Sequence, residues 1–362
     1  MTSSQHKPPS DREKAALHGP VRSVIEERTY PAWTDAEGEV TPAAQQWNKI
    51  EYDRDGRIFA TTWRAPARDR RTDSLTVIRF TRNATGDLLK RTAETDGKVA
   101  AETLYEYDDR GRLKSVSNSL DPSNPIAFRY DPSGRKTKIA IKKPVESPQG
   151  TTAVSSSMEN LFDEEGSSFT NTSEGGSTMT LYDELDRPAE VQFHDVNGAL
   201  TSRAIRVYDS QGRISEEKML MADPIAMIPA SDRKAIFDAG NIQDLRDQMS
   251  AFLGGSEMWS VKYEYDDKGR KVLTIQNTFN HIHMTTDTKY NQQGDVASEV
   301  THYEASGTGN PAAEENRSSE IIYTYEYDAQ GNWITQRTTS RDLPSGILKD
   351  VGAVVKRTID YY

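Results

Sequence analysis

Residues 105–112 read YEYDDRGR, and the spacing within this segment is typical of one local structure. Tyr107 precedes Asp108, two spacer residues, Gly111 and Arg112. A type I turn favours Asp at its first position and Gly at its fourth, because the carboxylate accepts hydrogen bonds from backbone N–H groups of the turn. Glycine also adopts the left-handed conformation of a β-bulge, which returns the chain as an antiparallel strand. The segment therefore predicts a hairpin tip, and we call the pattern aromatic–Asp–x–x–Gly the turn motif.

The turn motif recurs along the chain, as expected of a repeat architecture. Three degenerate copies begin at Phe162, Tyr182 and Tyr290, and weaker turns such as Asp96-Gly97 and Asn197-Gly198 lie between the motifs. The spacing indicates a unit of about 25 residues with two strands and two turns. In the six strict copies the turn residues are Asp53 and Gly56, Asp108 and Gly111, Asp131 and Gly134, Asp209 and Gly212, Asp266 and Gly269, and Asp328 and Gly331.

The segments that flank the motifs alternate between aromatic and polar residues. Tyr263-Glu264-Tyr265 and residues 323–327 both show this period of two. Such alternation is typical of strands, because successive side chains of a strand point to opposite faces of the sheet. The sequence therefore predicts antiparallel hairpins whose tyrosines line one face.

The turn motif followed by arginine resembles the YD repeat of bacterial RHS-type proteins, which also occurs in teneurins. The resemblance covers most of residues 45–335, and the endings 327–333 and 357–362 are similar to the close of small bacterial proteins built only from such repeats. It implies an all-β fold in which antiparallel hairpins form a long twisted, coiled or barrel-like sheet. It also implies an extracellular or cell-envelope location and contact with carbohydrate or with partner proteins.

The chain divides into four segments on this interpretation. Residues 1–18 are expected to form a polar tail, residues 19–222 a β region, residues 223–255 a helical insertion, and residues 256–362 a β region that continues the same unit. The first strand is predicted at 21–29. Within the insertion, Ser231 is a candidate cap of a short helix and Asn241 of a second one. Apolar residues recur at helical spacing in the second helix, which predicts a stripe that packs on the sheet or plugs an opening. The stripe consists of Ile242, Leu245, Met249, Phe252 and Leu253.

Composition excludes several classes of protein. Lys and Arg number 45 against 56 Asp and Glu, giving a net charge of −11 that disfavours nucleic acid as a partner. No stretch approaches the length of a membrane-spanning apolar helix, so we expect a soluble protein with no membrane span. The absence of cysteine removes disulfides and thiolate chemistry. The first residues lack the apolar core of a signal peptide, which leaves a cytoplasmic location open beside the extracellular one.

Two groups of residues are candidates for a site. His281 and His283 share a strand face, and His302 lies beyond the turn at 291–294, where a pairing of His283 with His302 would allow three imidazoles to bind zinc. Ordinary surface histidines are the alternative. The second group could offer flat surfaces to sugar rings or to another protein, or could belong to the sheet core. It consists of Trp33, Trp47, Trp63, Trp259 and Trp333.

The sequence lacks the usual signatures of catalysis. No phosphate-binding glycine loop or nucleophile elbow is present, and the repeated acids are explained as turn caps. We therefore expect a non-catalytic binding or scaffold protein that needs no cofactor. A shell or chaperone-like component of a secreted toxin system and a metal-dependent enzyme built on the histidines are the alternatives. The ligand and the oligomeric state are not specified by the sequence.

Overall fold

A computed structural model shows an all-β protein, as the turn motifs predicted. It describes residues 10–34, 40–65, 74–141, 176–195, 197–222, 242–252, 257–279, 281–305, 315–343, 345–346, 348–349 and 352–362. One antiparallel sheet contains 21 strands, and β2 (Trp33–Thr34) and β3 (Val40–Thr41) form a separate pair. The strands of the large sheet are β1 Val21–Tyr30, β4 Ala44–Tyr52, β5 Ile58–Ala65, β6 Ser74–Arg82, β7 Leu88–Thr95, β8 Lys98–Tyr107, β9 Leu113–Asn118, β10 Asp121–Tyr130, β11 Lys136–Ile141, β12 Gly176–Tyr182, β13 Pro188–His194, β14 Leu200–Tyr208, β15 Ile214–Met221, β16 Glu257–Tyr265, β17 Lys271–Thr278, β18 Ile282–Tyr290, β19 Val296–Ala305, β20 Glu315–Tyr327, β21 Trp333–Asp342, β22 Leu348–Lys349 and β23 Val354–Tyr361.

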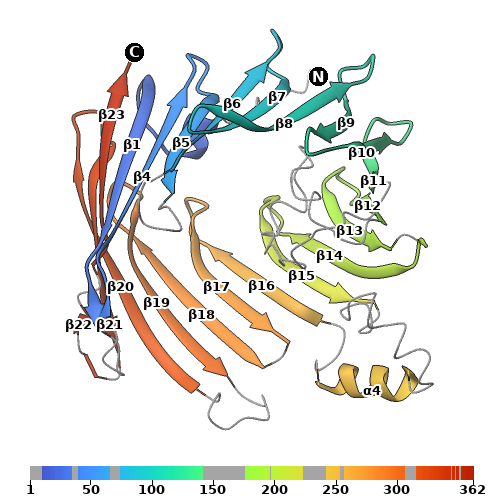
Figure 1. Cartoon of the computed structure of the whole chain (residues 1–362). Helices are drawn as coiled ribbons and strands as arrows, with labels where there is room; N and C mark the ends of the chain where they lie inside the picture. Colours follow the sequence, from blue (N-terminus) through green and yellow to red (C-terminus); the bar gives the residue numbers. More distant parts are fainter. Residues whose placement is uncertain are drawn as a thin grey trace.

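The strand pairings follow one another around a circle, which we call the strand ring (Figure 1). Successive strands pair from β4 to β21, and the pairings return through β23 and β1 to β4. The strand β1 is therefore bonded on both sides, to a strand near the end of the chain and to one near its start. Each long strand of the ring has a partner along both edges, so its backbone groups are not left to pair with other chains.

The turn motifs have the geometry that the sequence predicted. In all six strict copies the glycine has φ between +75° and +92°. In the copy at 265–270, the backbone N–H groups of Lys268 and Arg270 donate to Asp266 Oδ1 at 3.0 and 2.8 Å. The register then shifts by one residue beside Tyr265, which is the expected β-bulge. Asp186 takes the place of glycine in a degenerate copy and also has a positive φ, +61°. The copy at Phe162 lies outside the described residues.

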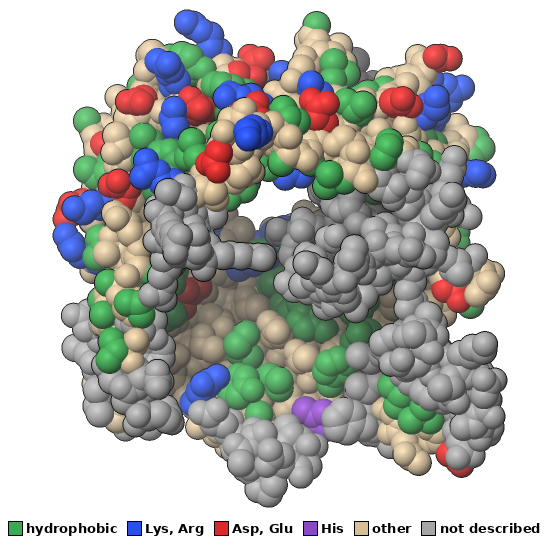
Figure 2. All heavy atoms as spheres, viewed as in Figure 1, with side chains coloured by type: hydrophobic (Ala, Val, Ile, Leu, Met, Phe, Trp, Pro, Cys, Tyr) green, Lys and Arg blue, Asp and Glu red, His purple; other side chains and the backbone are tan. Residues whose placement is uncertain are grey.

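The two faces of the sheet differ in polarity. Buried side chains of neighbouring strands form rows on one face, such as Tyr105, Val116 and Ile126. The other face carries cross-strand ion pairs such as Arg203–Glu190. Figure 2 shows charged side chains over the outside of the molecule and a hollow bounded by mainly uncharged side chains. The buried rows therefore lie on the inner face of the strand ring, where curvature crowds side chains together.

Of the polar tail expected at residues 1–18, the structure describes residues 10–18, and these contact the strand ring instead of extending from it. A short helix, α1 (Asp11–Lys14), begins with a capping box formed by Ser10 and Glu13. The backbone N–H of Arg12 donates to the Gly56 carbonyl at 2.9 Å, and Leu17 is only 8% exposed. The capping box stabilises the helix, and Leu17 together with a hydrogen bond from the Ile58 backbone N–H to Asp11 Oδ2 at 2.8 Å attaches this segment to the strand ring.

The second helix of the insertion is present as α4 (Ile242–Phe252), and the first one lies outside the described residues. Leu245 and Met249, two residues of the predicted stripe, are half-buried. Figure 1 shows α4 beyond the ends of β15 and β16, so the described helix does not plug the strand ring. In the described part of the chain, no helix has the length and apolar character needed to cross a membrane.

The left-handed glycines provide a test of the hairpin assignment. A Cβ at Gly269 would meet nothing within 4 Å, so Gly269→Ala should lower the free energy of unfolding through its φ of +78° alone, by about 1 kcal/mol. Gly56→Ala should cost more, because its Cβ would lie 2.9 Å from Ser10 Oγ. Urea denaturation measures both, with Lys268→Ala at an exposed spacer position as the control. Equal stability of Gly269→Ala and the control would contradict the assignment.

Candidate functional site

Successive turn motifs are joined by a repeated contact between three side chains, which we call the interlock. In one copy, Arg213 Nε donates to Asp209 Oδ2 at 2.7 Å, and the guanidinium lies 4.4 Å from the ring centroid of Tyr265 in the next motif. The Tyr265 hydroxyl donates back to the carbonyl of Ile214 at 2.6 Å. Five arginine–tyrosine pairs repeat this arrangement: Arg112–Tyr130, Arg135–Tyr182, Arg187–Tyr208, Arg213–Tyr265 and Arg270–Tyr290.

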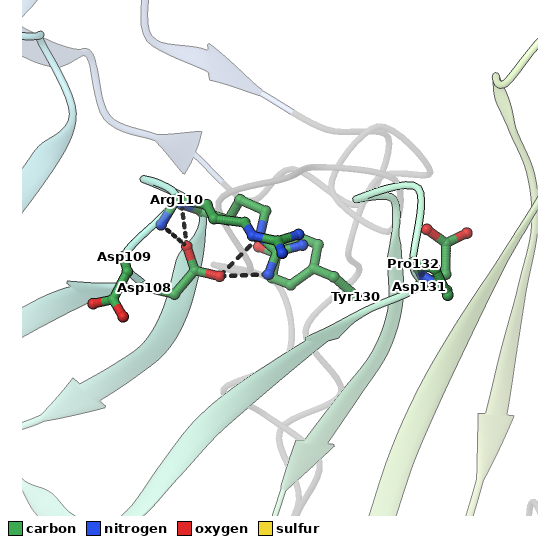
Figure 3. A pocket seen from close by; sticks show the side chains of 7 residues that line it. Asp108, Asp109, Arg110, Tyr130, Asp131 and Pro132 are labelled. Carbon is green, nitrogen blue, oxygen red and sulfur yellow. Dashed lines mark hydrogen bonds and ion pairs between the residues drawn. The ribbon is translucent and has the colours of Figure 1, made fainter.

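Figure 3 shows one interlock between two neighbouring hairpin tips. Asp108 accepts from Arg112, whose guanidinium lies 4.4 Å from the ring centroid of Tyr130. The two tips border a recess of about 470 Å³ that also includes Asp131. The carboxylates of Asp108 and Asp131 are engaged by arginines and by backbone N–H groups, so their repeated occurrence is explained by the turns.

The interlock shifts the pKa of its members in a consistent direction. Hydrogen bonds from the Arg112 side chain and backbone lower the pKa of Asp108 to about 2. Backbone and side-chain hydrogen bonds from Arg270 likewise lower the pKa of Asp266. Burial raises the pKa of Tyr265. The folded state thus favours ionised aspartates and neutral tyrosines.

The last strict motif uses a different set of partners, because Asn332 stands where the other motifs have arginine. Asn332 Nδ2 donates to the His18 carbonyl at 2.8 Å and to the Tyr361 hydroxyl at 2.7 Å. The Tyr361 hydroxyl donates to Asp328 Oδ2 at 2.5 Å. Residues near both ends of the chain therefore complete the interlock here, at the place where β1 joins β23, which we call the seam.

Several polar groups lie on the inner face of the strand ring. Arg206 Nη2 and Glu217 Oε1 are 2.7 Å apart, and their side chains are only 10% and 4% exposed. The Tyr263 hydroxyl donates to the same carboxylate at 2.9 Å. At the seam, Arg357 Nε donates to Glu26 Oε1 at 2.8 Å. These acids are paired with cations, so they add little net charge to the inner face.

The predicted zinc site does not form among the described residues. His302 is paired with Thr285 and not with His283, which is paired with Glu304. His283 Nδ1 lies 2.7 Å from Asn277 Oδ1, and His302 Nδ1 lies 2.7 Å from Ser318 Oγ. His281 lies in the turn before β18. Within the described ranges, no three His, Asp or Glu side chains are grouped so as to hold a metal ion.

The five tryptophans do not form one shared surface. Trp63, Trp259 and Trp333 belong to the inner face, where Trp259 packs against the buried pair Val191 and Ala204. Trp47 lies on the outer face with the Arg64 guanidinium 5.2 Å from its ring centroid. Trp33 lies in the small β2–β3 pair. The prediction of a shared aromatic binding surface therefore applies only to Trp63, Trp259 and Trp333, which share the inner face.

Sequence reasoning missed the seam. The replacement of arginine by Asn332 was visible within the last motif, and it was the signal that this motif contacts something other than another repeat. The pairing of Glu26 with Arg357 joins residues 331 positions apart, and no local pattern marks it.

Removal of one tyrosine hydroxyl should weaken the interlock without disturbing its aromatic ring. Tyr265→Phe deletes the hydrogen bond to the Ile214 carbonyl and should lower the free energy of unfolding by about 1 kcal/mol. Urea denaturation provides the measurement. Tyr30→Phe is the matched control, because its exposed hydroxyl makes only long contacts, with Arg28 Nη1 at 3.3 Å and with Gln46 Oε1 at 3.5 Å. An effect no larger than that of the control would contradict the role of this hydroxyl.

Acid should also weaken the interlock. Asp108 and Asp266 have lower pKa values in the folded state than in the unfolded one, so the unfolded state binds more protons as the pH falls. Their contribution to stability is complete above the unfolded-state pKa of about 4 and is lost as the pH falls through about 2. Thermal unfolding followed by circular dichroism across this range should show a falling Tm. A Tm that stays constant down to pH 2 or so would contradict the expectation.

Comparison with known proteins does not place the chain in a family. No protein-family model and no curated protein matches it. A porin-like protein from Bacteroides uniformis is 11% identical with a TM-score of 0.36, over 95% of this chain and 98% of that chain. The TcdB2-TccC3-TEV structure is 14% identical with a TM-score of 0.28, over 89% of this chain and only 16% of that chain. At these low scores the similarities assign neither a family nor a function.

Proposed function

We propose that this chain is a non-catalytic binding and scaffold protein of the RHS/YD-repeat type, acting outside the cell or in the cell envelope. In this proposal the strand ring holds a carbohydrate or a partner protein against its inner face. The proposal is carried by one observation, a hollow surrounded by a mainly uncharged wall (Figure 2). Aromatic side chains of the inner face include Tyr303 and Trp259. Aromatic and uncharged polar groups on a concave surface are suited to ligand binding.

The chemistry of the repeated residues supports a non-catalytic role. The aspartates of the motifs hold their turns, and the arginines engage both an aspartate and the next tyrosine. Groups that are fully engaged in hydrogen bonds and ion pairs at many equivalent places are suited to building a scaffold. A catalytic acid, base or nucleophile must instead be able to reach the substrate, and it usually occurs at a single site.

A second candidate function is a shell or chaperone-like component that holds a polypeptide. The hollow favours this second function, because a protein that holds an unfolded polypeptide needs a wall around that polypeptide. The inner face also offers hydrophobic side chains together with hydrogen-bonding groups, for example Met284, Thr301 and Tyr303, which border a recess of about 350 Å³ with Arg317 and Asp342. The two candidate functions use the same inner face of the strand ring and differ in the ligand that it holds.

Binding followed by footprinting tests the proposed surface. The full chain should bind members of a glycan array, and hydroxyl-radical footprinting with the bound glycan should protect inner-face residues such as Met284 and Tyr303. The outer-face Met179, which is 36% exposed, serves as the internal control. Binding of a reduced, alkylated polypeptide with the same footprint would favour the second function. Absence of binding to both probes, or protection of the outer face alone, would contradict the proposal.

A further inference from the structure

Five side chains form a continuous row across the seam on the inner face, which we call the seam row. The strand register places Trp63 opposite Asn48, Asn48 opposite Glu26, and Glu26 opposite Arg357. The Arg357 guanidinium lies 3.3 Å from the ring centroid of Trp333. The row thus crosses β5, β4, β1, β23 and β21, and a tryptophan stands at each end.

The two tryptophans have different surroundings. Trp333 is held by Arg357 on one side and lies 6.1 Å from Tyr325, measured between ring centroids. No cation or aromatic ring of the described residues packs on Trp63. Trp63 is half-buried, so part of its side chain reaches the surface and offers an aromatic contact to a ligand.

The groups between the tryptophans are polar and have no net charge. Glu26 and Arg357 neutralise each other at 2.8 Å, yet their side chains remain 20% and 17% exposed. Asn48 Nδ2 donates to Glu26, whereas Asn48 Oδ1 has no hydrogen-bond donor among the described residues. A buried acceptor without a donor is unfavourable, and a small rotation of this amide would let a ligand hydroxyl group satisfy it. The row therefore suits an uncharged ligand rich in hydroxyl groups.

The length of the row limits the size of that ligand. Neighbouring strands are about 4.8 Å apart, so the four spacings from Trp63 to Trp333 amount to about 19 Å. This length is comparable to that of a tetrasaccharide, and the apolar face of a sugar ring can pack on the Trp63 indole. A peptide of this length would present mainly backbone groups and varied side chains, for which the row has no repeated match.

We propose that the seam row is a binding site for a neutral oligosaccharide of about four sugar rings. This inference rests on the proposed glycan-binding function and assigns it a place and a ligand class. The row is completed by β1 and β23, which come from opposite ends of the chain. A ligand that spans the row contacts both strands, so its binding stabilises the seam as well as satisfying the polar groups.

Calorimetric titration of the full chain with maltotetraose, cellotetraose and tetra-N-acetylchitotetraose, three uncharged tetrasaccharides, tests the site. At least one of these probes should bind and should raise the Tm. Trp63→Ala should weaken that binding by about tenfold, because it removes the available aromatic surface. Trp47→Ala is the matched control, since Trp47 lies on a neighbouring strand and points to the outer face. Asn48→Ala should also weaken binding, and circular dichroism spectra establish that each variant is folded.

The outcomes separate the site from the general function. If Trp63→Ala and Trp47→Ala weaken binding equally, the seam row is not the binding site, although the protein still binds glycans. Preference for acidic oligosaccharides would overturn the neutral ligand class. Binding of only the alkylated polypeptide would overturn the site's glycan chemistry and favour the second candidate function. Absence of binding to every probe, including the glycan array, would remove the proposed function itself.

Discussion

The stacking of one motif's arginine on the next motif's tyrosine is the interaction on which the architecture depends. Hydrogen bonds within a hairpin fix only that hairpin, whereas the interlock fixes each hairpin tip relative to its neighbour. A single exposed cation–π contact contributes only about 0.5–1 kcal/mol. Five such contacts along one edge of the sheet, each accompanied by a hydrogen bond from tyrosine to the backbone, make neighbouring tips adopt the same relative position.

A row of equivalent contacts needs different chemistry where it ends. At the seam the motif at 327–332 contacts residues of β1 and β23 and their neighbours, and Asn332 replaces the arginine. The short amide reaches the His18 carbonyl and the Tyr361 hydroxyl, which a guanidinium stacked on a ring could not do in the same space. The burial of Leu17 and the ion pair between Glu26 and Arg357 add to this junction. The described segments near the two ends, residues 10–30 and 354–361, therefore belong to the strand ring.

The sequence was sufficient to predict the hairpins, because their signals are local. Asp266, Gly269 and the alternating tyrosines lie within a few residues of one another, and turn chemistry determines their conformation. The return of the pairings through β1 could not be predicted in this way, since the contacts join distant residues. The histidine register shows a smaller failure of the same kind. The turn closes between Tyr290 and Val296, and the bulge that follows shifts the register by a further residue, so His302 meets Thr285.

The hollow explains how a chain with only 35% apolar residues can form such a large sheet. A solid interior would require two tightly packed apolar faces, and this composition does not supply them. A strand ring needs hydrophobic rows only where curvature brings neighbouring inner side chains together, and its strand edges are satisfied by pairing. The inner face is then free to carry neutralised polar pairs such as Arg206 with Glu217.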